Sequence, residues 1–298
     1  METGVQDAES DLADLPTELW EKAMTNCTIG MDLGGTRLLL CCGELEESFN
    51  TGVLFTPTQL LQLLESFIER HGLQPECIGL AVPGLVSNGK VIDCDVLPAF
   101  KGWPAQKALQ AHAQQVAVLN DVEAALLEEM HDAPANITGG VIMVGTAVGA
   151  AFMTQGQPLR GANGWAGELG YLPIQYDNHV RRLDELAGGA AIAKTCAVAP
   201  DVLARQAEAG DQATLQIIEQ AGTAFGLGLA AVINLFNPAV LAVGGGTSDL
   251  PGYWPAALAA ARQHSLPALW QSCSLSRVRS GNRIVALGAM RAARAVEL

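Results

Sequence analysis

Three glycine-rich turns in this 298-residue chain each follow a short apolar segment. They are DLGGT at residues 32–36, GTAVG at 145–149 and VGGGTS at 243–248, which we call the first, second and third turns. Glycines at a strand end let several backbone N–H groups face one point and bind an oxyanion, and a threonine hydroxyl adds a further donor. Each turn alone is also compatible with an ordinary connection. All three in this order favour a phosphate-binding site.

Asp32 begins the first turn, beside an apolar segment that predicts a buried strand. A carboxylate in such a place must be hydrogen-bonded, bound to a metal or close to a ligand, because an uncompensated buried charge is costly. The motif on its own leaves a structural hairpin and a ligand site equally open.

A second pair of residues suited to chemistry, Asn120 and Asp121, lies between the first two turns in LNDVEAALLEEM. A carboxylate at a strand end can orient a hydroxyl group and accept its proton, as phosphoryl transfer to an alcohol requires. Both residues also suit the N-cap of a helix, which is the simpler interpretation. A cap and a general base are compatible at one helix N-terminus.

Two common nucleotide-binding motifs fail to explain the chain. It has no GxxxxGK[ST] segment, which excludes a P-loop. The segment 226–231 matches GxGxx[GA], but it lies inside a long helical pattern instead of between a strand and a helix. We therefore expect its small residues to allow close helix packing.

The segments that must position these residues alternate between strand-like and helix-like patterns. Helices are predicted within 56–72, 102–114, 211–236 and 284–296, and strands within 29–33, 37–43, 77–84, 116–120, 139–153 and 239–246. Such alternation indicates an α/β sheet. Because the strand, glycine turn and strand of the opening recur at 139–153, we expect a second domain to begin there.

Composition narrows the class of protein. With 49% hydrophobic residues the chain can build a large core, and its net charge of −14 argues against a nucleic-acid partner, which would need a basic face. No apolar stretch reaches the roughly 18 residues of a membrane span, and no secretory signal begins the chain, so we expect a cytoplasmic protein with no membrane partner. Seven cysteines without a CxxC pair fit reduced thiols. The acidic residues 1–26 are expected to form a flexible extension.

Together the motifs resemble the ROK family of sugar kinases and regulators, within the actin-like ATPase superfamily. The resemblance covers residues 27–296 and implies a two-domain α/β protein with the actin-like ATPase (ribonuclease H-like) fold and a sugar/nucleotide cleft between the domains. The domains expected are 27–135, completed by 284–298, and 136–283.

The resemblance also implies roles for the motif residues. Asp121 would be the general base, and Asp32 would face Mg²⁺, through water, beside the phosphates of ATP. The implied nucleotide-binding residues are Asp32, Gly34, Gly35, Thr36, Gly145, Thr146, Gly149, Gly244, Gly245 and Gly246. The implied sugar-binding residues are Gly84, Asn120, Glu168, Tyr171 and Asp184.

Two of the sugar-binding assignments come from longer segments. GANGWAGELGY at 161–171, which we call the sugar loop, resembles the family's GxxGxAGExGH. The resemblance implies that Glu168 accepts hydrogen bonds from sugar hydroxyls. RRLDELAGGAAI resembles GCLExxxSGxAI, with Asp184 in place of a second sugar-binding glutamate that is one methylene longer.

The zinc site found in many family members is missing its ligands. Tyr171 replaces the histidine of the sugar-loop motif, and residues 172–182 contain no cysteine. His179 is solitary there, and a site that needs four N or S ligands cannot be built from it. We therefore expect a protein without zinc, whose loop is fixed by something other than metal.

Further departures concern the ligands themselves. Ala99 in LPAFKGW stands where the family's PNLxGW has an asparagine that contacts a sugar hydroxyl. Losing such a partner can change sugar selectivity strongly. Ala147 and Ala151 replace glycines of the second phosphate motif.

These observations predict an ATP- and Mg²⁺-dependent kinase that phosphorylates a hexose or aminosugar, at its primary (C6) hydroxyl, and that forms a homodimer. Two alternatives stay open. A non-catalytic sugar-sensing or regulatory protein is favoured by Tyr171, Ala99 and Ala147, whereas the intact first turn and Asp121 argue against it. A polyphosphate-dependent kinase is the other, because family members with a zinc-free loop include some that use polyphosphate.

Overall fold

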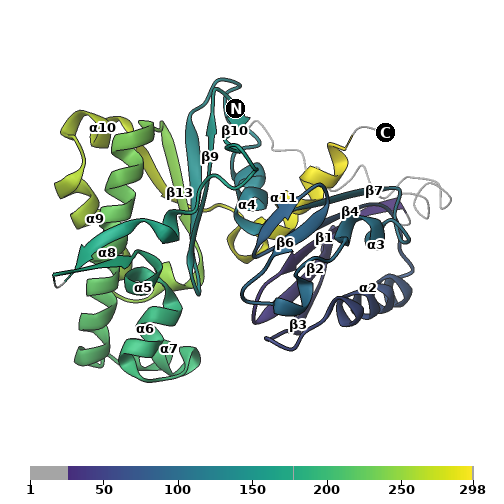
Figure 1. Cartoon of the computed structure of the whole chain (residues 1–298), viewed down its shortest axis with the longest axis horizontal. Helices are drawn as coiled ribbons and strands as arrows, with labels where there is room; N and C mark the ends of the chain where they lie inside the picture. Colours follow the sequence, from purple (N-terminus) through teal and green to yellow (C-terminus); the bar gives the residue numbers. More distant parts are fainter. Residues whose placement is uncertain (1–25, 177, 297–298) are drawn as a thin grey trace, which may run out of the picture.

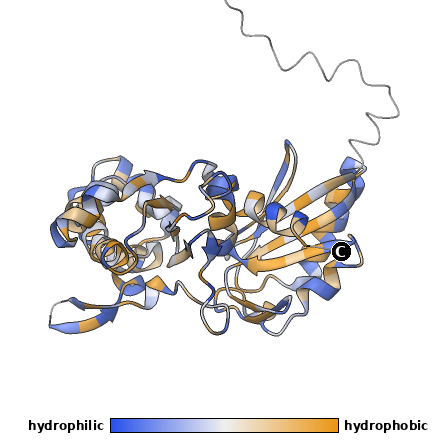
Figure 2. Ribbon diagram, turned by 90° about the horizontal axis from the view of Figure 1, so that it is seen from above, coloured by the Kyte–Doolittle hydropathy of each residue, from blue (hydrophilic) through white to orange (hydrophobic). Residues whose placement is uncertain are grey.

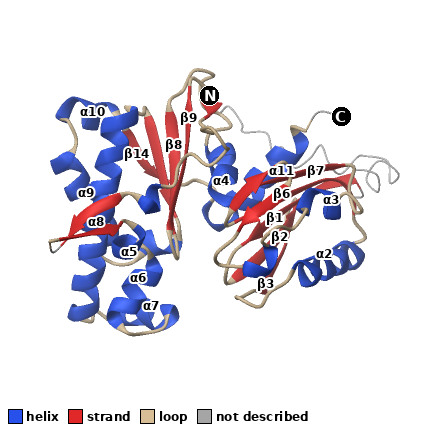
Figure 3. Ribbon diagram, in the orientation of Figure 1, coloured by secondary structure: helices blue, strands red, loops and turns tan. Residues whose placement is uncertain are grey.

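The computed structural model describes residues 26–176 and 178–296, and its two β-sheets stand apart with helices around and between them (Figure 1). The first sheet has the strand order β3-β2-β1-β4-β7, and the second has the order β10-β9-β8-β13-β14 (Figure 3). We call the parts built on these sheets the N-terminal half and the C-terminal half. The domain boundaries predicted at residues 135 and 283 stay a prediction.

Both sheets begin with an antiparallel hairpin and continue with parallel strands. In the first sheet β1 pairs antiparallel with β2 and parallel with β4, and β4 pairs parallel with β7. In the second, β8 pairs antiparallel with β9 and parallel with β13, and β13 pairs parallel with β14. The first and second turns are thus the hairpin turns of corresponding strands. The strands are β1 (Asn26–Leu33), β2 (Arg37–Cys42), β3 (Leu45–Asn50), β4 (Gln74–Val82), β7 (Gln115–Asn120), β8 (Gly139–Val144), β9 (Val148–Thr154), β10 (Gln157–Pro158), β13 (Val240–Gly244) and β14 (Ser274–Arg277).

Helix α2 (Pro57–His71) covers the first sheet and confirms the helix predicted at 56–72. The Thr56 side chain and Gln59 form a capping box at its start, and Gly72 ends it in the left-handed conformation (φ 60°). Helix α3 (Ala105–Leu109) is much shorter than the predicted 102–114, although Ala113 beyond it is also buried. Central strands of the first sheet are mostly hydrophobic in Figure 2.

Helices α4 (Asp121–Glu129) and α11 (Ile284–Arg294) lie between the two sheets (Figure 1). Their buried residues form one apolar cluster with residues of both sheets. A side chain at Gly79 of β4 would overlap the backbone of Ala289, and one at Gly288 would overlap that of Ala124. The last helix of the chain therefore packs at backbone distance on β4 and α4.

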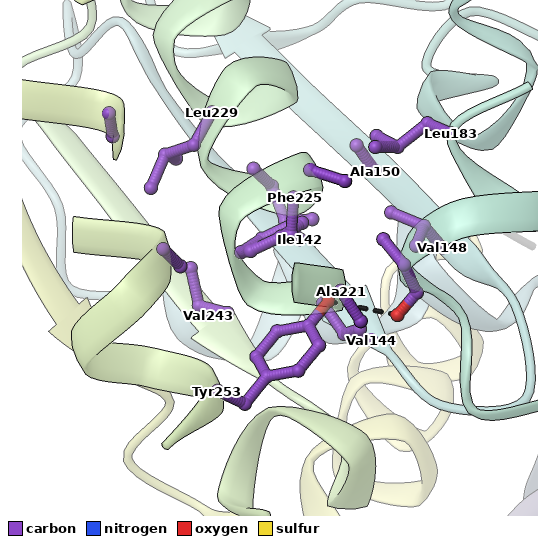
Figure 4. Close-up of a cluster of buried hydrophobic side chains, with 14 of the residues drawn as sticks. Ile142, Val144, Val148, Ala150, Leu183, Ala221, Phe225, Leu229, Val243 and Tyr253 are labelled. Atoms are coloured by element: carbon purple, nitrogen blue, oxygen red, sulfur yellow. Dashed lines mark hydrogen bonds between the residues drawn. The ribbon is translucent and has the colours of Figure 1, made fainter. Parts of the chain in front are cut away.

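The long helix α8 (Gln212–Phe236) covers the outer face of the second sheet together with α9 (Tyr253–His264). A side chain at Gly226 would overlap the backbone of α9, so the expectation that the small residues of segment 226–231 allow close helix packing is confirmed there. Gly222, one turn earlier, packs on α9 in the same way. Among the described helices α8 is long and apolar enough to cross a membrane, yet 61% of its most apolar window is buried inside the protein, as in a core helix. Figure 4 shows Phe225 of this helix packed near Tyr253, Ile142 and Val144.

The remaining elements connect these layers. Two further pairs of strands are β5 (Leu85–Ser87) with β6 (Lys90–Asp93), and β11 (Pro173–Tyr176) with β12 (His179–Arg182). The remaining helices are η1 (Pro98–Phe100), η2 (Leu169–Tyr171), α5 (Asp184–Ala187), α6 (Gly189–Cys196), α7 (Pro200–Glu208), η3 (Gly246–Asp249), α10 (Pro267–Ser272) and η4 (Gly281–Arg283).

Candidate active site

Three carboxylates from separate segments act on one another electrostatically. Asp32 is the last residue but one of β1, Asp121 begins α4, and Glu168 lies in the sugar loop. Burial, the charge of Asp32 and, to a smaller extent, the charge of Glu168 raise the pKa of Asp121 to about 7. Burial also raises the pKa of Asp32 to about 6, although Arg37 opposes that rise. Groups with such perturbed pKa values are typical of catalytic sites.

The helix that carries Asp121 is capped by Asn120. The Asn120 Oδ1 accepts hydrogen bonds from the backbone N–H groups of Val122 (2.8 Å) and Glu123 (3.3 Å), so the N-cap expected for this residue is confirmed. Its Nδ2 donates to the carbonyl oxygen of Gly84 at 3.1 Å. The two residues predicted to bind sugar, Asn120 and Gly84, thus contact each other directly. Asp121 accepts from the N–H of Val122 at 2.9 Å, which fixes its carboxylate at the helix start.

The first turn is tight and closed by nearby residues. The N–H of Gly34 donates to the carbonyl oxygen of Arg37 at 2.7 Å, and Thr51 Oγ1 donates to the carbonyl oxygen of Gly34 at 2.7 Å. Gly35 packs against Val96, and Thr36 is exposed. This arrangement leaves Asp32 at the base of a rigid backbone loop.

The second turn packs against α4 on one side and is open on the other. A side chain at Gly149 would come within 2.7 Å of the Val122 side chain, so β9 packs against the first turn of α4. A side chain at Gly145 would meet nothing within 4 Å, and Thr146 is exposed. The turn therefore combines a fixed base with an unfilled outer side.

Residues from distant segments hold the second turn. The N–H groups of Gly189 and Ala190 donate to the carbonyl oxygens of Gly145 (2.8 Å) and Thr146 (3.1 Å). Thr247 of the third turn donates its hydroxyl to the Gly145 carbonyl oxygen at 2.8 Å. The second and third turns are therefore one hydrogen-bonded unit.

The third turn depends on glycine for its shape. Gly245 has φ 90°, and a side chain there would overlap the carbonyl oxygen of Val144. Gly244 is packed against Val278, whereas the space beside Gly246 is open. Ser248 Oγ donates to the carbonyl oxygen of Gly245 at 2.6 Å.

The sequence motifs did not point to Arg277, which supports the third turn from β14. Its guanidinium donates to Ser248 Oγ at 2.7 Å, is ion-paired with Asp249, and lies 5.3 Å from the ring centroid of Trp254. Thr247 and Ser248 belong to the VGGGTS segment, so their polarity was a usable signal. Arg277 had none, since the contact joins β14 to the short helix Gly246–Asp249, and these elements are not adjacent in sequence.

The sugar loop brings Glu168 and Tyr171 to the edge of the second sheet. Burial and then the charge of Asp184 raise the pKa of Glu168, although its side chain is exposed. Tyr171 is 54% exposed, and the Arg182 guanidinium lies 4.8 Å from its ring centroid. Tyr171 is therefore the outlying member of the predicted sugar-binding set.

The hairpin β11–β12 stands where the family has its zinc loop. Four residue pairs, from Pro173 opposite Arg182 to Tyr176 opposite His179, join the two strands. Among the described residues no group of three or more His, Cys, Asp or Glu side chains is placed to hold a metal ion. Backbone pairing is thus the observed support of this loop.

A pocket of about 290 Å³ lies beside the sugar loop. Its lining is mostly apolar and comes from β9, the sugar loop and the end of α8. The lining residues are Phe152, Gly167, Glu168, Leu169, Tyr171, Leu172, Ala231, Val232, Leu235 and Phe236. Because it offers few polar groups, the carboxylate cluster is the better candidate for binding a sugar.

The residues fit a nucleotide with Mg²⁺ on two structural grounds. The open space beside Gly145 and Gly246 admits phosphate oxygens or a nucleoside close to the backbone. Asp32 and Asp121 repel each other and lack a cation strong enough to lower their pKa values, which a divalent ion would supply. Mg²⁺ is commonly held by one or two carboxylates together with substrate phosphates.

Comparison with known proteins agrees with this geometry. A model of the ROK family matches residues 28–296. A β-glucoside kinase from Klebsiella pneumoniae is 26% identical over 258 residues, which cover 78% of this chain and 84% of that protein.

Solved structures of similar fold include proteins of two kinds. A ROK family transcriptional regulator, a homologue of the E. coli MLC protein, is 22% identical with a TM-score of 0.77, covering 91% of this chain and 78% of its own. A ROK family glucokinase from Streptomyces griseus, solved with glucose and AMPPNP, is 20% identical with a TM-score of 0.75, covering 90% of this chain and 99% of its own. The actin-like ATPase fold predicted from the sequence is confirmed.

Proposed function

This chain belongs to the ROK family, and from that premise we propose that it is a kinase that transfers phosphate from ATP to the primary (C6) hydroxyl of a hexose or aminosugar. Its curated relatives include sugar kinases. The single observation that carries the proposal is the half-buried Asp121 carboxylate, held at a helix N-terminus where the charges of Asp32 and Glu168 act on it and where the second turn packs.

In this proposal Asp121 is the general base. Its carboxylate would accept the proton of the attacking sugar hydroxyl as the phosphoryl group is transferred. Asn120 holds the segment in place through its cap and its bond to Gly84, so the base is oriented before substrate binds. Glu168 would accept hydrogen bonds from other hydroxyls of the same sugar and fix its orientation.

The phosphate donor would lie along the three turns. The N–H groups and Thr36 of the first turn and those of the second turn would bind the phosphates, and the third turn would lie beside the adenosine. Asp32 would hold Mg²⁺ through water, and that ion would supply positive charge to the phosphates. ATP is favoured as donor because a structural relative was solved with the ATP analogue AMPPNP.

Two alternatives keep specific support. A sugar-sensing protein without catalysis is favoured by the regulator among the structural relatives and by Tyr171 at the histidine position. Polyphosphate is a possible donor because an Arthrobacter relative is named an inorganic polyphosphate/ATP-glucomannokinase. We infer a cytoplasmic homodimer without zinc as the working state of the protein.

The deciding experiment is a transfer assay with ATP and with polyphosphate across glucose, mannose, N-acetylglucosamine, N-acetylmannosamine and a β-glucoside. We expect transfer from ATP to at least one of these sugars, with the product phosphorylated at C6. Sugar binding by calorimetry with no transfer from either donor would favour the sensor. Transfer from polyphosphate alone would replace ATP as donor.

A further inference from the structure

Asp184 bonds to the second turn instead of projecting as a free ligand. Its Oδ1 accepts a hydrogen bond from the backbone N–H of Val148 at 2.7 Å, across 36 residues of sequence. Val148 is the fourth residue of the second turn and the first residue of β9. The carboxylate therefore fixes the point where the turn enters its strand.

The rest of this segment holds the other side of the same turn. Gly189 and Ala190, at the start of α6, donate their N–H groups to the carbonyl oxygens of Gly145 and Thr146. Segment 184–190 thus accepts one hydrogen bond from the turn and donates two to it. A short segment that contacts a loop on both sides determines which way the N–H groups of that loop point.

The carboxylate of Asp184 also lies against the sugar loop. A side chain at Gly170 would overlap both of its oxygens, so the loop backbone and the carboxylate occupy adjoining space. The charge of Asp184 contributes to the raised pKa of Glu168 in the same loop. One carboxylate therefore lies between the predicted phosphate turn and the predicted sugar loop.

We propose that Asp184 is a positioning residue that holds the second turn in its nucleotide-binding shape and sets its distance from the sugar loop, in place of the sugar contact that the family resemblance implies. Aspartate is one methylene shorter than glutamate, so its carboxylate stays at the backbone of Val148 and Gly170. The inference rests on the proposed kinase function.

The test measures AMPPNP and sugar binding separately by calorimetry. The sugar is glucose or N-acetylglucosamine, whichever the unsubstituted protein phosphorylates faster. Asp184→Ala removes the acceptor and is expected to weaken AMPPNP binding between about tenfold and a hundredfold, with sugar affinity changed by less than about twofold. Asp184→Asn keeps an acceptor oxygen and is expected to restore most of the AMPPNP affinity.

Gly170→Ala provides an independent route to the same change. Its methyl group would displace the Asp184 carboxylate, so AMPPNP binding should weaken although Asp184 is present. In the Asp184→Ala background the same substitution should have little further effect, since the two residues act through one contact. Asp201→Ala, an exposed carboxylate of α7, is the matched control and should bind both ligands normally.

A sugar-ligand role predicts the reverse, namely weakened sugar binding in both Asp184→Ala and Asp184→Asn with normal AMPPNP binding, and that result would overturn the inference. Equal AMPPNP binding by all variants would do the same. Absence of AMPPNP binding in the unsubstituted protein would overturn the proposed ATP-dependent function, and this inference with it.

Discussion

The first and second turns have related sequences and corresponding places in their sheets, but different contacts hold them. In the first turn Gly34 bonds to Arg37, and its hydrogen bond from Thr51 spans 17 residues. The second turn is held by Asp184, 36 residues away, and by Thr247, 102 residues away.

This difference separates two ways of supporting a glycine-rich turn. The hydrogen bonds of the first turn come from its own hairpin and from Thr51, so its shape follows largely from the local sequence. The second turn depends on segment 184–190 and on the third turn, so a change in either should alter its shape. Ala147, where the family resemblance implies glycine, lies in the turn that has this outside support, and Ala151, the other such position, lies in β9.

Asp121 lies between the two turns, and its substitution should have the largest effect on activity. Asp121→Asn keeps the size and one acceptor oxygen, so both ligands should still bind while transfer falls by about 10² to 10⁴, roughly 3 to 5 kcal/mol of barrier. Transfer is measured per folded molecule, beside calorimetric binding of sugar and AMPPNP. Asp201→Asn is the control. Equal turnover in wild type and Asp121→Asn would show that Asp121 only caps the helix and is not the general base.

Gly245→Ala should show how strictly the hydrogen-bonded second and third turns constrain the backbone. Alanine must adopt φ near 90° and overlap the carbonyl of Val144, so we expect the free energy of unfolding to fall by about 3 kcal/mol or more. Gly35→Ala in the first turn is the matched variant, since its new methyl group would lie 3.3 Å from the Val96 side chain and its φ is ordinary. Urea denaturation should show that Gly35→Ala lowers the free energy of unfolding by less than about 1 kcal/mol. Similar losses in Gly245→Ala and Gly35→Ala would mean that the first and third turns constrain the backbone equally.

Because of Asp32 and Asp121, stability and activity should depend on pH in opposite directions. Burial raises the folded-state pKa values of Asp32 to about 6 and of Asp121 to about 7. Because the unfolded chain loses these protons at lower pH, the free energy of unfolding should be highest below about pH 4 and should fall as pH rises through 6 to 7. A general base works only when deprotonated, so kcat/KM should instead rise with pH through about 7.

Thermal denaturation of ligand-free protein and kcat/KM, each followed from pH 5 to 8.5, would check both trends. Asp121→Asn should show a weaker fall of stability with pH, because one of the two groups is gone. Parallel slopes in wild type and Asp121→Asn would mean that Asp121 titrates normally.

The smallest effects are expected from single threonine hydroxyls. Thr247→Val removes the bond to Gly145 and Thr51→Val removes the bond to Gly34, and each should lower the free energy of unfolding by about 1 kcal/mol. Only the Thr247 hydroxyl joins two turns, so only Thr247→Val should also weaken AMPPNP binding, by a few fold. A larger loss of AMPPNP affinity in Thr51→Val would show that the first turn also depends on a contact outside itself.

The same division explains what the sequence could predict. Strand pairs around the two glycine turns, helix α2 with its caps and the cap at Asn120 follow from local patterns, and the structure has them. The bond from Val148 to Asp184 and the support from Arg277 join segments far apart in the chain, and no local pattern encodes them. The length of helix α3 was overestimated because the apolar spacing of Ala105, Leu109 and Ala113 continues beyond the helix, and all three residues are buried.

The position of α11 has a consequence for the order in which the protein can form during synthesis. Residues 284–294 pack at backbone distance on β1 and β4, at Gly30 and Gly79. The first sheet therefore cannot complete its packing until this later segment of the chain has been synthesised. Until residues 284–294 have been synthesised, the face of β1 and β4 on which α11 packs is not covered by that helix. The N-terminal half, although synthesised first, can therefore be completed only after the C-terminal half, and it is the part most exposed to chaperones and aggregation during translation.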